Sequence, residues 1–425
     1  MNSPGATIVQ CTVTTKKQQV SLDVKKIRED FPILKELVYN KPLIYLDNGA
    51  TTQKPRVVID TLTELQESRN SSIHRGIHFL SEQMTESYEQ ARETVRSFIN
   101  AASKNEIVFT SGATGSINAI AFSFGEKFVS SGDEILISEM EHHSNIVPWQ
   151  MLCERKGAVL KIIPFDERGV LDLEEYQKLL NPKTRLVAVT QASNSLGTIN
   201  PVKEMIKTAH QYEIPVLIDG AQMVQHGEVD VLDLDCDFYV FSSHKIFGPT
   251  GSGVLYGKEK MLEDLPPYQG GGDMVETVSF KKTSYNELPF KFEAGTSNYM
   301  GAIGLGSALE YLQSLGIREI MAYEKELIAY TNTQLSGVDG LSILGTSPDK
   351  IAVFSILLEG AHPYDVGMIL DKMGIAVRTG THCTQPVMDH FGISGTTRAS
   401  MVFYNTFEEV DQLVAGIEKT MQMLV

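Results

Sequence analysis

The chain has 425 residues, a net charge of −16, a hydrophobic fraction of 42% and a charged fraction of 21%. A chain of this length is expected to form more than one domain, and its apolar content is that of a globular protein. The acidic balance argues against nucleic acid as a partner, because phosphate binding needs clustered Lys and Arg. The longest apolar runs are only as long as strands, so we expect no membrane-spanning segment.

Residues 1–20 are polar and rich in Thr and Gln, without a basic start followed by an apolar core. This pattern excludes an ordinary secretory signal and predicts a flexible extension. The cysteines are scattered and have neither a CxxC pair nor metal-ligand spacing, so no metal site is expected. Few cysteines in a long chain are typical of free thiols, and we expect a cytoplasmic protein. The cysteines are Cys11, Cys153, Cys236 and Cys383.

Apolar runs of strand length alternate with amphipathic helices in the middle of the chain. Nearly continuous apolar strands linked by helices predict an α/β fold with a buried, largely parallel sheet. Pro201 stands in the first turn of one helix, where proline is favoured. The expected elements are strand 106–110, helix 114–128, strand 134–138, helix 146–156, strand 158–165, strand 185–190, a helix from 201, and strand 214–219.

The pattern changes after the glycine run 270–272. Residues 275–298 are polar and are expected to be irregular, and the elements that follow predict a smaller α+β domain. Those elements are helix 301–315, helix 319–335, strand 351–357 and helix 406–423, whose first turns are acidic, as the helix dipole favours. We therefore expect three parts: the extension 1–20, a large domain 45–300, and a small domain made of 21–44 with 301–425.

Polar residues follow the predicted strands at their carboxyl ends, where open α/β sheets bind ligands. Segment 111–114 follows one strand and opens a helix, so its free N–H groups can cradle an anion, although such turns are commonly only turns. His142 follows the next strand, and an isolated pair of loop histidines is more simply interpreted as solvated. Asn194 lies in a further polar segment after strand 185–190.

Asp219 ends the predicted strand 214–219, and Lys245 follows a further apolar run that begins at Cys236. An aspartate at a strand end is often a helix cap, but no clear helix follows this one. The lysine is either a surface residue or an amine placed inside a pocket. An anion cradle, a buried Asp, a stacking His and a Lys in an apolar setting together match the needs of pyridoxal 5'-phosphate. Burial lowers the pKa of a lysine, and a buried Asp keeps the pyridine nitrogen protonated.

Several short segments resemble the cysteine desulfurases of the class V aminotransferase fold, and most closely their group II branch, which includes selenocysteine lyases. The resemblance runs from about Leu22 to the C-terminus. It implies the type I fold of pyridoxal-phosphate-dependent transferases, with a mostly parallel sheet in the large domain and a smaller α+β C-terminal domain. The segments are Tyr45-Leu-Asp-Asn-Gly-Ala, His74-Arg-Gly-Ile-His78, Glu141-His-His-Ser-Asn-Ile-Val-Pro-Trp149, Asp219-Gly-Ala-Gln222, Ser242-Ser-His-Lys245, Phe292-Glu-Ala-Gly-Thr296 and Arg378-Thr-Gly-Thr-His-Cys383.

The resemblance implies a cofactor role for each matching residue. Lys245 would be the Schiff-base lysine, and His142 would stack on the ring and assist proton transfer. The other implied contacts are Asp219 to the pyridine nitrogen, Gln222 to the ring hydroxyl, Thr114, Ser242 and His244 to the phosphate, and Thr296 to the phosphate from the partner subunit of a homodimer.

For the substrate, the resemblance implies that Asn194 and Arg398 bind the carboxylate end and that Cys383, with Arg378 nearby, accepts the sulfur. Cys383 also stands out without the resemblance. Its polar loop includes Arg378 and His382, and such neighbours favour an accessible thiolate. The alternative, a structural thiol under a loop, fits this setting less well. Cys153 and Cys236 are expected to be inert packing residues.

Three positions depart from the usual family pattern. Gly115 stands where a glutamate is common, Ser243 replaces a glycine, and Thr381 replaces a frequent histidine. The first change is expected to weaken a polar link near the subunit interface, and the last to alter how Cys383 meets its acceptor. None of the three removes a group that the core chemistry requires.

The expected activity is the conversion of L-cysteine to L-alanine, with the sulfur held as a persulfide on Cys383 and passed to an acceptor protein. The resemblance implies iron–sulfur cluster assembly as the use of that sulfur. A selenocysteine lyase acting on L-selenocysteine, an aminotransferase-like enzyme on another amino acid, and a cofactor-binding scaffold without turnover remain the alternatives.

Overall fold

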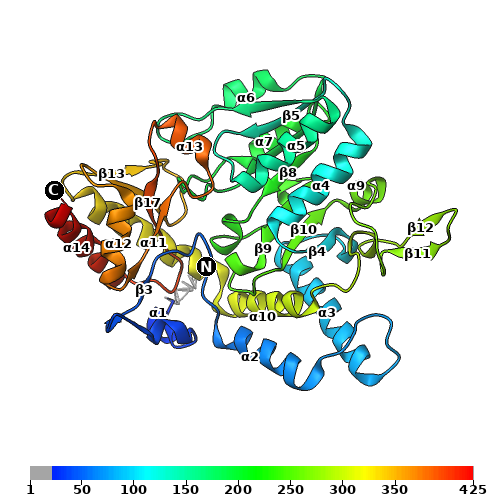
Figure 1. Cartoon of the computed structure of the whole chain (residues 1–425), viewed down its shortest axis with the longest axis horizontal. Coiled ribbons are helices and arrows are strands. Elements are labelled where there is room, and N and C mark those ends of the chain that lie inside the picture. The colour runs from blue at the N-terminus through cyan, green and yellow to red at the C-terminus, as the bar shows by residue number, and fades with distance from the viewer. Residues whose placement is uncertain (1–21, 425) are drawn as a thin grey trace, which may run out of the picture.

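The computed structural model describes residues 22–424, and its larger part is built on a seven-stranded sheet (Figure 1). The strands are β4 (Ile107–Thr110), β5 (Glu134–Ser138), β6 (Val159–Ile163), β7 (Thr184–Thr190), β8 (Val216–Asp219), β9 (Phe238–Ser242) and β10 (Gly253–Gly257). Their order is β4-β10-β9-β8-β7-β5-β6. The last five are parallel, and β10 runs antiparallel to both of its neighbours. The predicted largely parallel sheet is confirmed.

Helices cover both faces of this sheet, and successive strand residues point to opposite faces. Phe109 and Ile218 belong to the core on one face, together with α3 (Phe79–Phe98) and α10 (Tyr299–Leu315). Val108 belongs to the core on the other face, with α4 (Ala113–Phe128) and α5 (Val147–Lys156). Burial on both faces explains why the strands have nearly continuous apolar sequences. The other helices here are α2 (Arg56–Glu64), α6 (Leu173–Leu179), α7 (Val202–His210), α8 (Val231–Leu234) and α9 (Glu259–Asp264).

A four-stranded antiparallel sheet forms the smaller part, at the left of Figure 1, in the order β13-β14-β17-β16. These strands are β13 (Leu341–Leu344), β14 (Val353–Leu358), β16 (Arg378–Gly380) and β17 (Thr396–Ser400). Leu327, Leu370 and Leu413 pack under this sheet. They come from α11 (Ile317–Ser336), α12 (Pro363–Lys372) and α14 (Phe407–Leu424). The helix α13 (Gln385–His390) follows β16.

The first described segment packs against the smaller part. The strand β3 (Ile44–Tyr45) pairs in parallel with β15 (Ile375–Ala376). Arg28, at the end of α1 (Val24–Arg28), lies 2.8 Å from the carboxylate of Glu409. The remaining short elements are β1 (Leu37–Val38), β2 (Lys41–Pro42), the 3-10 helices η1 (Pro32–Lys35), η3 (Lys104–Glu106), η4 (His143–Asn145), η5 (Met223–Gln225), η6 (Ser243–Lys245) and η7 (Phe290–Phe292), and the π-helix η2 (Leu65–Arg69).

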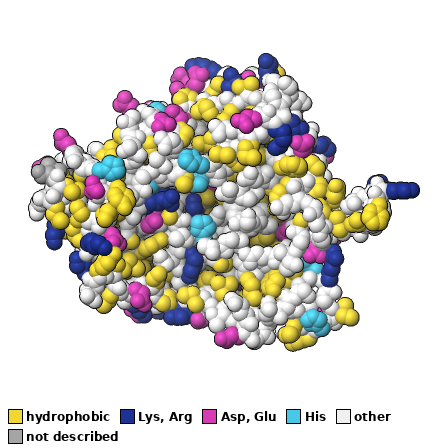
Figure 2. All heavy atoms as spheres, in the orientation of Figure 1, with side chains coloured by type: hydrophobic (Ala, Val, Ile, Leu, Met, Phe, Trp, Pro, Cys, Tyr) yellow, Lys and Arg dark blue, Asp and Glu magenta, His cyan; other side chains and the backbone are white. Residues whose placement is uncertain are grey.

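The expectation that residues 275–298 are irregular is wrong. Strands β11 (Val275–Val278) and β12 (Thr283–Tyr285) form a hairpin that projects at the right of Figures 1 and 2. Its apolar side chains Val278 and Phe280 are exposed. Because neither face of the hairpin is buried in the chain, its sequence lacks the apolar alternation by which a half-buried strand is recognised.

The other predicted helices and strands are confirmed, with ends that differ by a few residues. The elements that the sequence did not predict include the antiparallel β10 and the helices α2, α3, α6, α8, α9 and α12. Residues 1–20 and Cys11, predicted to form an extension, lie outside the described residues. No helix within 22–424 combines the length and apolarity needed to cross a membrane.

Candidate active site

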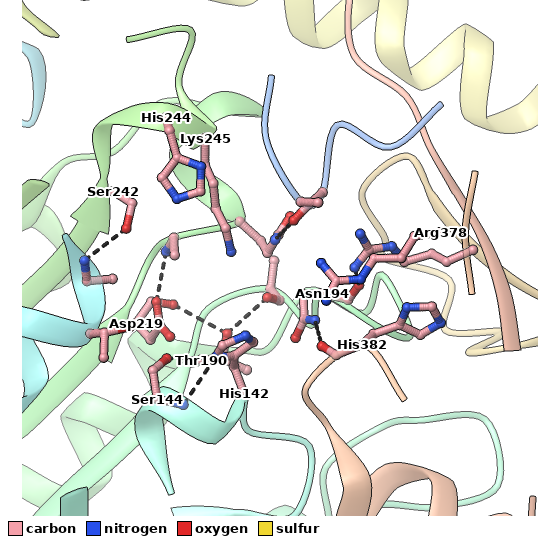
Figure 3. A pocket seen from close by; sticks show the side chains of 18 residues that line it. His142, Ser144, Thr190, Asn194, Asp219, Ser242, His244, Lys245, Arg378 and His382 are labelled. Atoms are coloured by element: carbon pink, nitrogen blue, oxygen red, sulfur yellow. Dashed lines mark hydrogen bonds between the residues drawn. The ribbon is translucent and has the colours of Figure 1, made fainter. Parts of the chain in front are cut away.

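The carboxyl ends of the parallel strands open into a cavity that collects most of the predicted site residues (Figure 3). Lys245 and His142 point into this space from opposite sides, with Asp219 and Ser242 toward one end and Arg378 and His382 toward the other. The lining residues are Gly49, Ala50, Ala113, Thr114, His142, Ser144, Thr190, Ala192, Asn194, Asp219, Ala221, Gln222, Ser242, His244, Lys245, Arg378, His382 and Arg398.

Lys245 reaches the cavity from η6, directly after the buried strand β9. Burial lowers the pKa of its amine from 10.5 to about 8, although the nearby charge of Asp219 acts in the opposite direction. A fraction of the amine is therefore neutral near pH 7 and can act as a nucleophile or a base. This is the setting that the sequence predicts for the lysine.

Asp219 ends β8, which is the parallel neighbour of β9, so the carboxylate and the lysine leave adjacent strand ends. Its Oδ1 atom accepts a hydrogen bond from Ala221 N at 2.9 Å. Burial raises the pKa of the carboxyl, whereas that hydrogen bond and the charge of Lys245 lower it. A cationic ring nitrogen beside Asp219 would offset the cost of this buried charge.

His142 faces the cavity as a neutral imidazole. Its Nδ1 atom accepts a hydrogen bond from Ser144 N at 3.1 Å and lies 2.7 Å from Ser144 Oγ. Burial, together with the positive charge of Lys245, lowers the pKa of His142 to about 3. A neutral ring held at one nitrogen can stack on a flat aromatic group, as the resemblance implies.

Gln222 presents a buried acceptor to the cavity. Its Nε2 atom donates to Gly49 O at 2.8 Å, whereas its Oε1 atom has no hydrogen-bond partner within residues 22–424. A buried polar atom without a partner is costly. A ring hydroxyl at this end of the cavity would satisfy it, so the residues present fit pyridoxal phosphate.

The predicted anion cradle lies at the ends of two strands, β4 and β9, that are not adjacent in the sheet. Ser242, at the end of β9, accepts a hydrogen bond from Ala113 N at 2.9 Å, at the start of α4. The first turn of a helix leaves N–H groups free for an anion. The strand between them begins with Gly253, where an added Cβ would lie 2.4 Å from the Cα of Gly112 and 2.6 Å from Phe241 O. The two loops can approach each other only because residue 253 has no side chain.

His244 lines the cavity near Ser242, and burial lowers the pKa of its ring to about 4. It is therefore neutral at physiological pH and can donate one hydrogen bond to a phosphate without adding charge. Thr114, in the first turn of α4, lies on the same wall.

Two arginines and an amide stand at the other end of the cavity. Arg398 is 1% exposed; it donates to Asn194 O at 2.9 Å and to Asp47 Oδ1 at 2.9 Å, and its Nε atom has no partner among the described residues. Asn194 donates to His382 O at 2.8 Å. Asp47 was not predicted as a site residue, because a carboxylate that pairs with an arginine 351 positions away has no local sequence pattern.

Cys383 lies beside this end, and its Sγ atom is 3.7 Å from a guanidinium nitrogen of Arg378. Cys383 and the preceding His382 both have positive φ angles, 61° and 54°, which non-glycine residues seldom adopt. Cys383 O accepts a hydrogen bond from His143 N at 2.8 Å, which ties the cysteine loop to the segment that carries His142.

The other described cysteines differ from Cys383. Cys153 and Cys236 are buried, and burial raises the pKa of both thiols, that of Cys153 to about 11. Protonated, buried thiols are poor nucleophiles.

Thr296 is the one predicted site residue that lies away from this cavity and from the cysteine loop. It lines a second hollow, together with Ser111, Gly251, Tyr268 and Asn298. The assignment of Thr296 to the site of a partner subunit stays a prediction.

The aminotransferase class-V family profile matches residues 44–413. A cysteine desulfurase of Escherichia coli O127:H6 is 50% identical over 406 residues, which cover 95% of this chain and 100% of that protein. A cysteine desulfurase of Synechococcus elongatus is 52% identical over 400 residues, and the chain spans 64% of its length. The apo structure of a cysteine desulfurase from Thermococcus onnurineus NA1 has a TM-score of 0.90 and 37% identity, covering 94% of this chain and 98% of that one. The chain therefore belongs to the aminotransferase class-V family, in its cysteine desulfurase branch.

Proposed function

We propose that the protein converts L-cysteine to L-alanine with pyridoxal phosphate as cofactor and holds the released sulfur on Cys383. The observation that carries this proposal is the placement of Arg378, which lines the cavity of Lys245 and also contacts Cys383 Sγ. A nucleophilic sulfur thus stands beside the cavity that holds the reactive amine.

When bound, the cofactor supplies an electron-withdrawing ring that stabilises negative charge on the substrate's carbon atoms. Asp219 would hold a proton on the ring nitrogen, and Gln222 Oε1 would accept a hydrogen bond from the ring hydroxyl. Lys245 removes the proton from the substrate's α-carbon, because its lowered pKa leaves a neutral amine available. Asn194 and Arg398 hold the substrate carboxylate.

The Cys383 thiolate attacks the sulfur of the substrate. The carbon–sulfur bond breaks, a sulfur–sulfur bond forms, and the electron pair of the broken bond remains on the substrate's β-carbon, which takes up a proton. Alanine and a Cys383 persulfide result, and no external oxidant or reductant is needed. Arg378, which contacts Cys383 Sγ and also lines the cavity, holds this sulfur beside the substrate.

We further propose a homodimer in which Thr296 completes the phosphate site of the partner subunit, and a protein acceptor that removes the persulfide sulfur for iron–sulfur cluster assembly. The exposed apolar hairpin β11–β12 supports an association between chains, because an isolated hairpin is marginally stable in water. The unpaired thiols of Cys153, Cys236 and Cys383 support a cytoplasmic location.

The test is to incubate the full chain, loaded with pyridoxal phosphate, with L-cysteine and dithiothreitol, and to quantify alanine, sulfide and keto acids. The dithiol supplies the two electrons that release the outer persulfide sulfur as sulfide. Alanine with sulfide is expected, and Lys245→Ala should abolish it. Cys383→Ser should bind cofactor normally yet release no sulfur. A keto acid product would instead indicate transamination. The same assay with L-selenocysteine distinguishes a selenocysteine lyase, which would form alanine from selenocysteine but not from cysteine.

A further inference from the structure

One buried side chain, that of Thr52, holds the backbone on both sides of Lys245. Its Oγ1 atom donates to His244 O at 3.1 Å and accepts from Phe247 N at 2.7 Å. Thr52 N also donates to His244 O at 3.0 Å. Thr52 is 1% exposed, so water does not compete for these bonds. A single hydroxyl thus donates one hydrogen bond to His244 and accepts another from Phe247, one residue on each side of Lys245.

The carbonyl of His244 receives further donors from the same segment. Thr51 Oγ1 lies 3.1 Å from it and Lys54 Nζ lies 3.3 Å from it. Four donors from residues 51–54 therefore converge on the peptide group that directly precedes Lys245. This convergence fixes the position and orientation of that peptide group, from which the lysine side chain extends into the cavity.

Phe247 shows that the backbone after Lys245 needs such support. Its φ angle is 66°, a left-handed conformation that carries an energetic cost for a bulky residue. Its ring packs against Phe403, with ring centres 4.9 Å apart, and against Phe31 and Tyr404. The hydrogen bond to Thr52 and this packing together offset the cost and hold the turn in one conformation.

We propose that Thr52 is a positioning residue for the desulfurase reaction, which fixes the Lys245 amine at the buried place where it acts. This inference rests on the proposed function. Thr52 is not among the residues that line the cavity, so it acts through the lysine and not on the substrate. Without its hydroxyl, the turn can relax and the amine gains access to water.

The test compares Thr52→Val, which keeps the shape but loses the hydroxyl, with Thr52→Ser, which keeps the hydroxyl. Thr63→Val is the matched control, because Thr63 is exposed on α2 and its hydroxyl bonds only to Ile59 O. The first readout uses the chain without cofactor: trace acylation by acetic anhydride across pH, with the Lys245 peptide quantified by mass spectrometry. Lys350 serves as the internal standard, because burial lowers its pKa to about 8 and its amine bonds to Gly345 O.

In Thr52→Val, the pH at which Lys245 is half-maximally labelled should rise toward that of an exposed lysine. The corresponding pH for Lys350 should stay unchanged. With cofactor and cysteine, kcat should fall roughly tenfold and KM should change less than about twofold, the pattern of a misplaced catalytic group. Thr52→Ser and Thr63→Val should match the wild-type protein in both readouts.

A lower melting temperature with unchanged labelling and unchanged kcat would show that Thr52 only stabilises the fold, and would overturn the proposal. So would a Thr52→Ser variant as impaired as Thr52→Val. If Thr52→Val does not fold, Thr52→Ala makes the same comparison. If the wild-type protein forms no alanine, the proposed function fails, but the labelling of Lys245 still decides the role of Thr52.

Discussion

The Sγ atom of Cys383 lies 3.7 Å from a guanidinium nitrogen of Arg378, a residue that also lines the cavity of Lys245. A guanidinium carries a positive charge, which here stands directly beside the sulfur. The same cation therefore contacts the proposed sulfur-accepting thiol and lines the cavity where the substrate is expected to bind.

Arg378→Met should slow the alkylation of Cys383 by iodoacetamide at neutral pH by roughly tenfold, because the sulfur reacts as an anion and the positive charge that contacts it is lost. Mass spectrometry of the Cys383 peptide measures the rate. Arg168→Met is a suitable control, since Arg168 is exposed and pairs with Asp166. Equal rates in both variants would remove Arg378 from this role.

Turnover with cysteine alone should begin with one rapid cycle and then slow, because the loop of Cys383 is short and held to His143 N. A persulfide kept in the pocket is poorly reached by small thiols. Rapid-quench measurement of alanine should show a burst close to one per site. A protein acceptor with its own cysteine should raise the later rate and leave the burst unchanged. Linear alanine production, unaffected by every acceptor tried, would contradict this.

Two inactive variants should restore activity when they are mixed, if Thr296 completes the partner's site. A chain with Lys245→Ala supplies Thr296, and a chain with Thr296→Val supplies Lys245. After unfolding and refolding together, half of the dimers are mixed and each has one intact site. The mixture should therefore reach about a quarter of wild-type activity. Activity no higher than the average of the separate variants argues that each site is built from one chain.

His210 should stabilise the fold more at low pH than at high pH. Its Nε2 atom lies 2.8 Å from Asp237 Oδ2 and its Nδ1 atom lies 3.3 Å from Asp235. The hydrogen bond to Asp237 raises the pKa of His210 above its usual value, against burial and the charge of Lys258. Because the folded-state pKa is the higher one, the stabilisation is complete below the unfolded value of about 6.5 and is lost as the pH rises through the folded value.

His210→Asn should therefore lower the urea midpoint of unfolding more at pH 5.5 than at pH 9. His78→Asn, at an exposed position, is the control for the change of residue type. A loss that is equal at both pH values would mean that packing, not charge, accounts for the contribution of His210.

Gly248→Ala should destabilise the protein, because an added Cβ would lie 2.2 Å from Ser243 Oγ. Ser243→Ala should be neutral or stabilising, since the Ser243 hydroxyl is buried without a partner among the described residues. Such an unsatisfied group lowers the free energy of unfolding by roughly 1–3 kcal/mol. The double variant should recover part of the stability, because the remaining contacts of the new methyl group lie at 3.2 and 3.3 Å. A double-mutant cycle of melting temperatures measures this coupling, and purely additive effects would refute it.

The sequence predicted most strands and helices between residues 106 and 219 because short, nearly continuous apolar runs alternate there with longer mixed segments. The strand β10 was missed, since Gly253-Val-Leu-Tyr is short and follows a glycine-rich turn that hides its start. The domain boundary at residue 300 stays a prediction. The helix α10 crosses that boundary and packs on α2 and α3, so we propose that the smaller domain begins after it.

The site could be predicted where side chains stand at strand ends, as Asp219 and His142 do. Residues whose side chains bond to backbone groups elsewhere in the chain have no recognisable sequence pattern. Thr52 is one hydroxyl among many, and its two partners lie more than 190 positions away. The roles assigned to the individual site residues remain proposals that the variants above test.

The absence of a side chain at Gly253 also limits how this site can change. A methyl group there would clash with Gly112 and with Phe241 O, and would push Ser242 away from the start of α4. A bound phosphate would then lose the donors proposed for it, although none of the residues proposed to contact it had been altered. We therefore expect that a substitution at Gly253, outside the cavity, abolishes phosphate binding. Mutagenesis limited to the residues that line the cavity would miss this position.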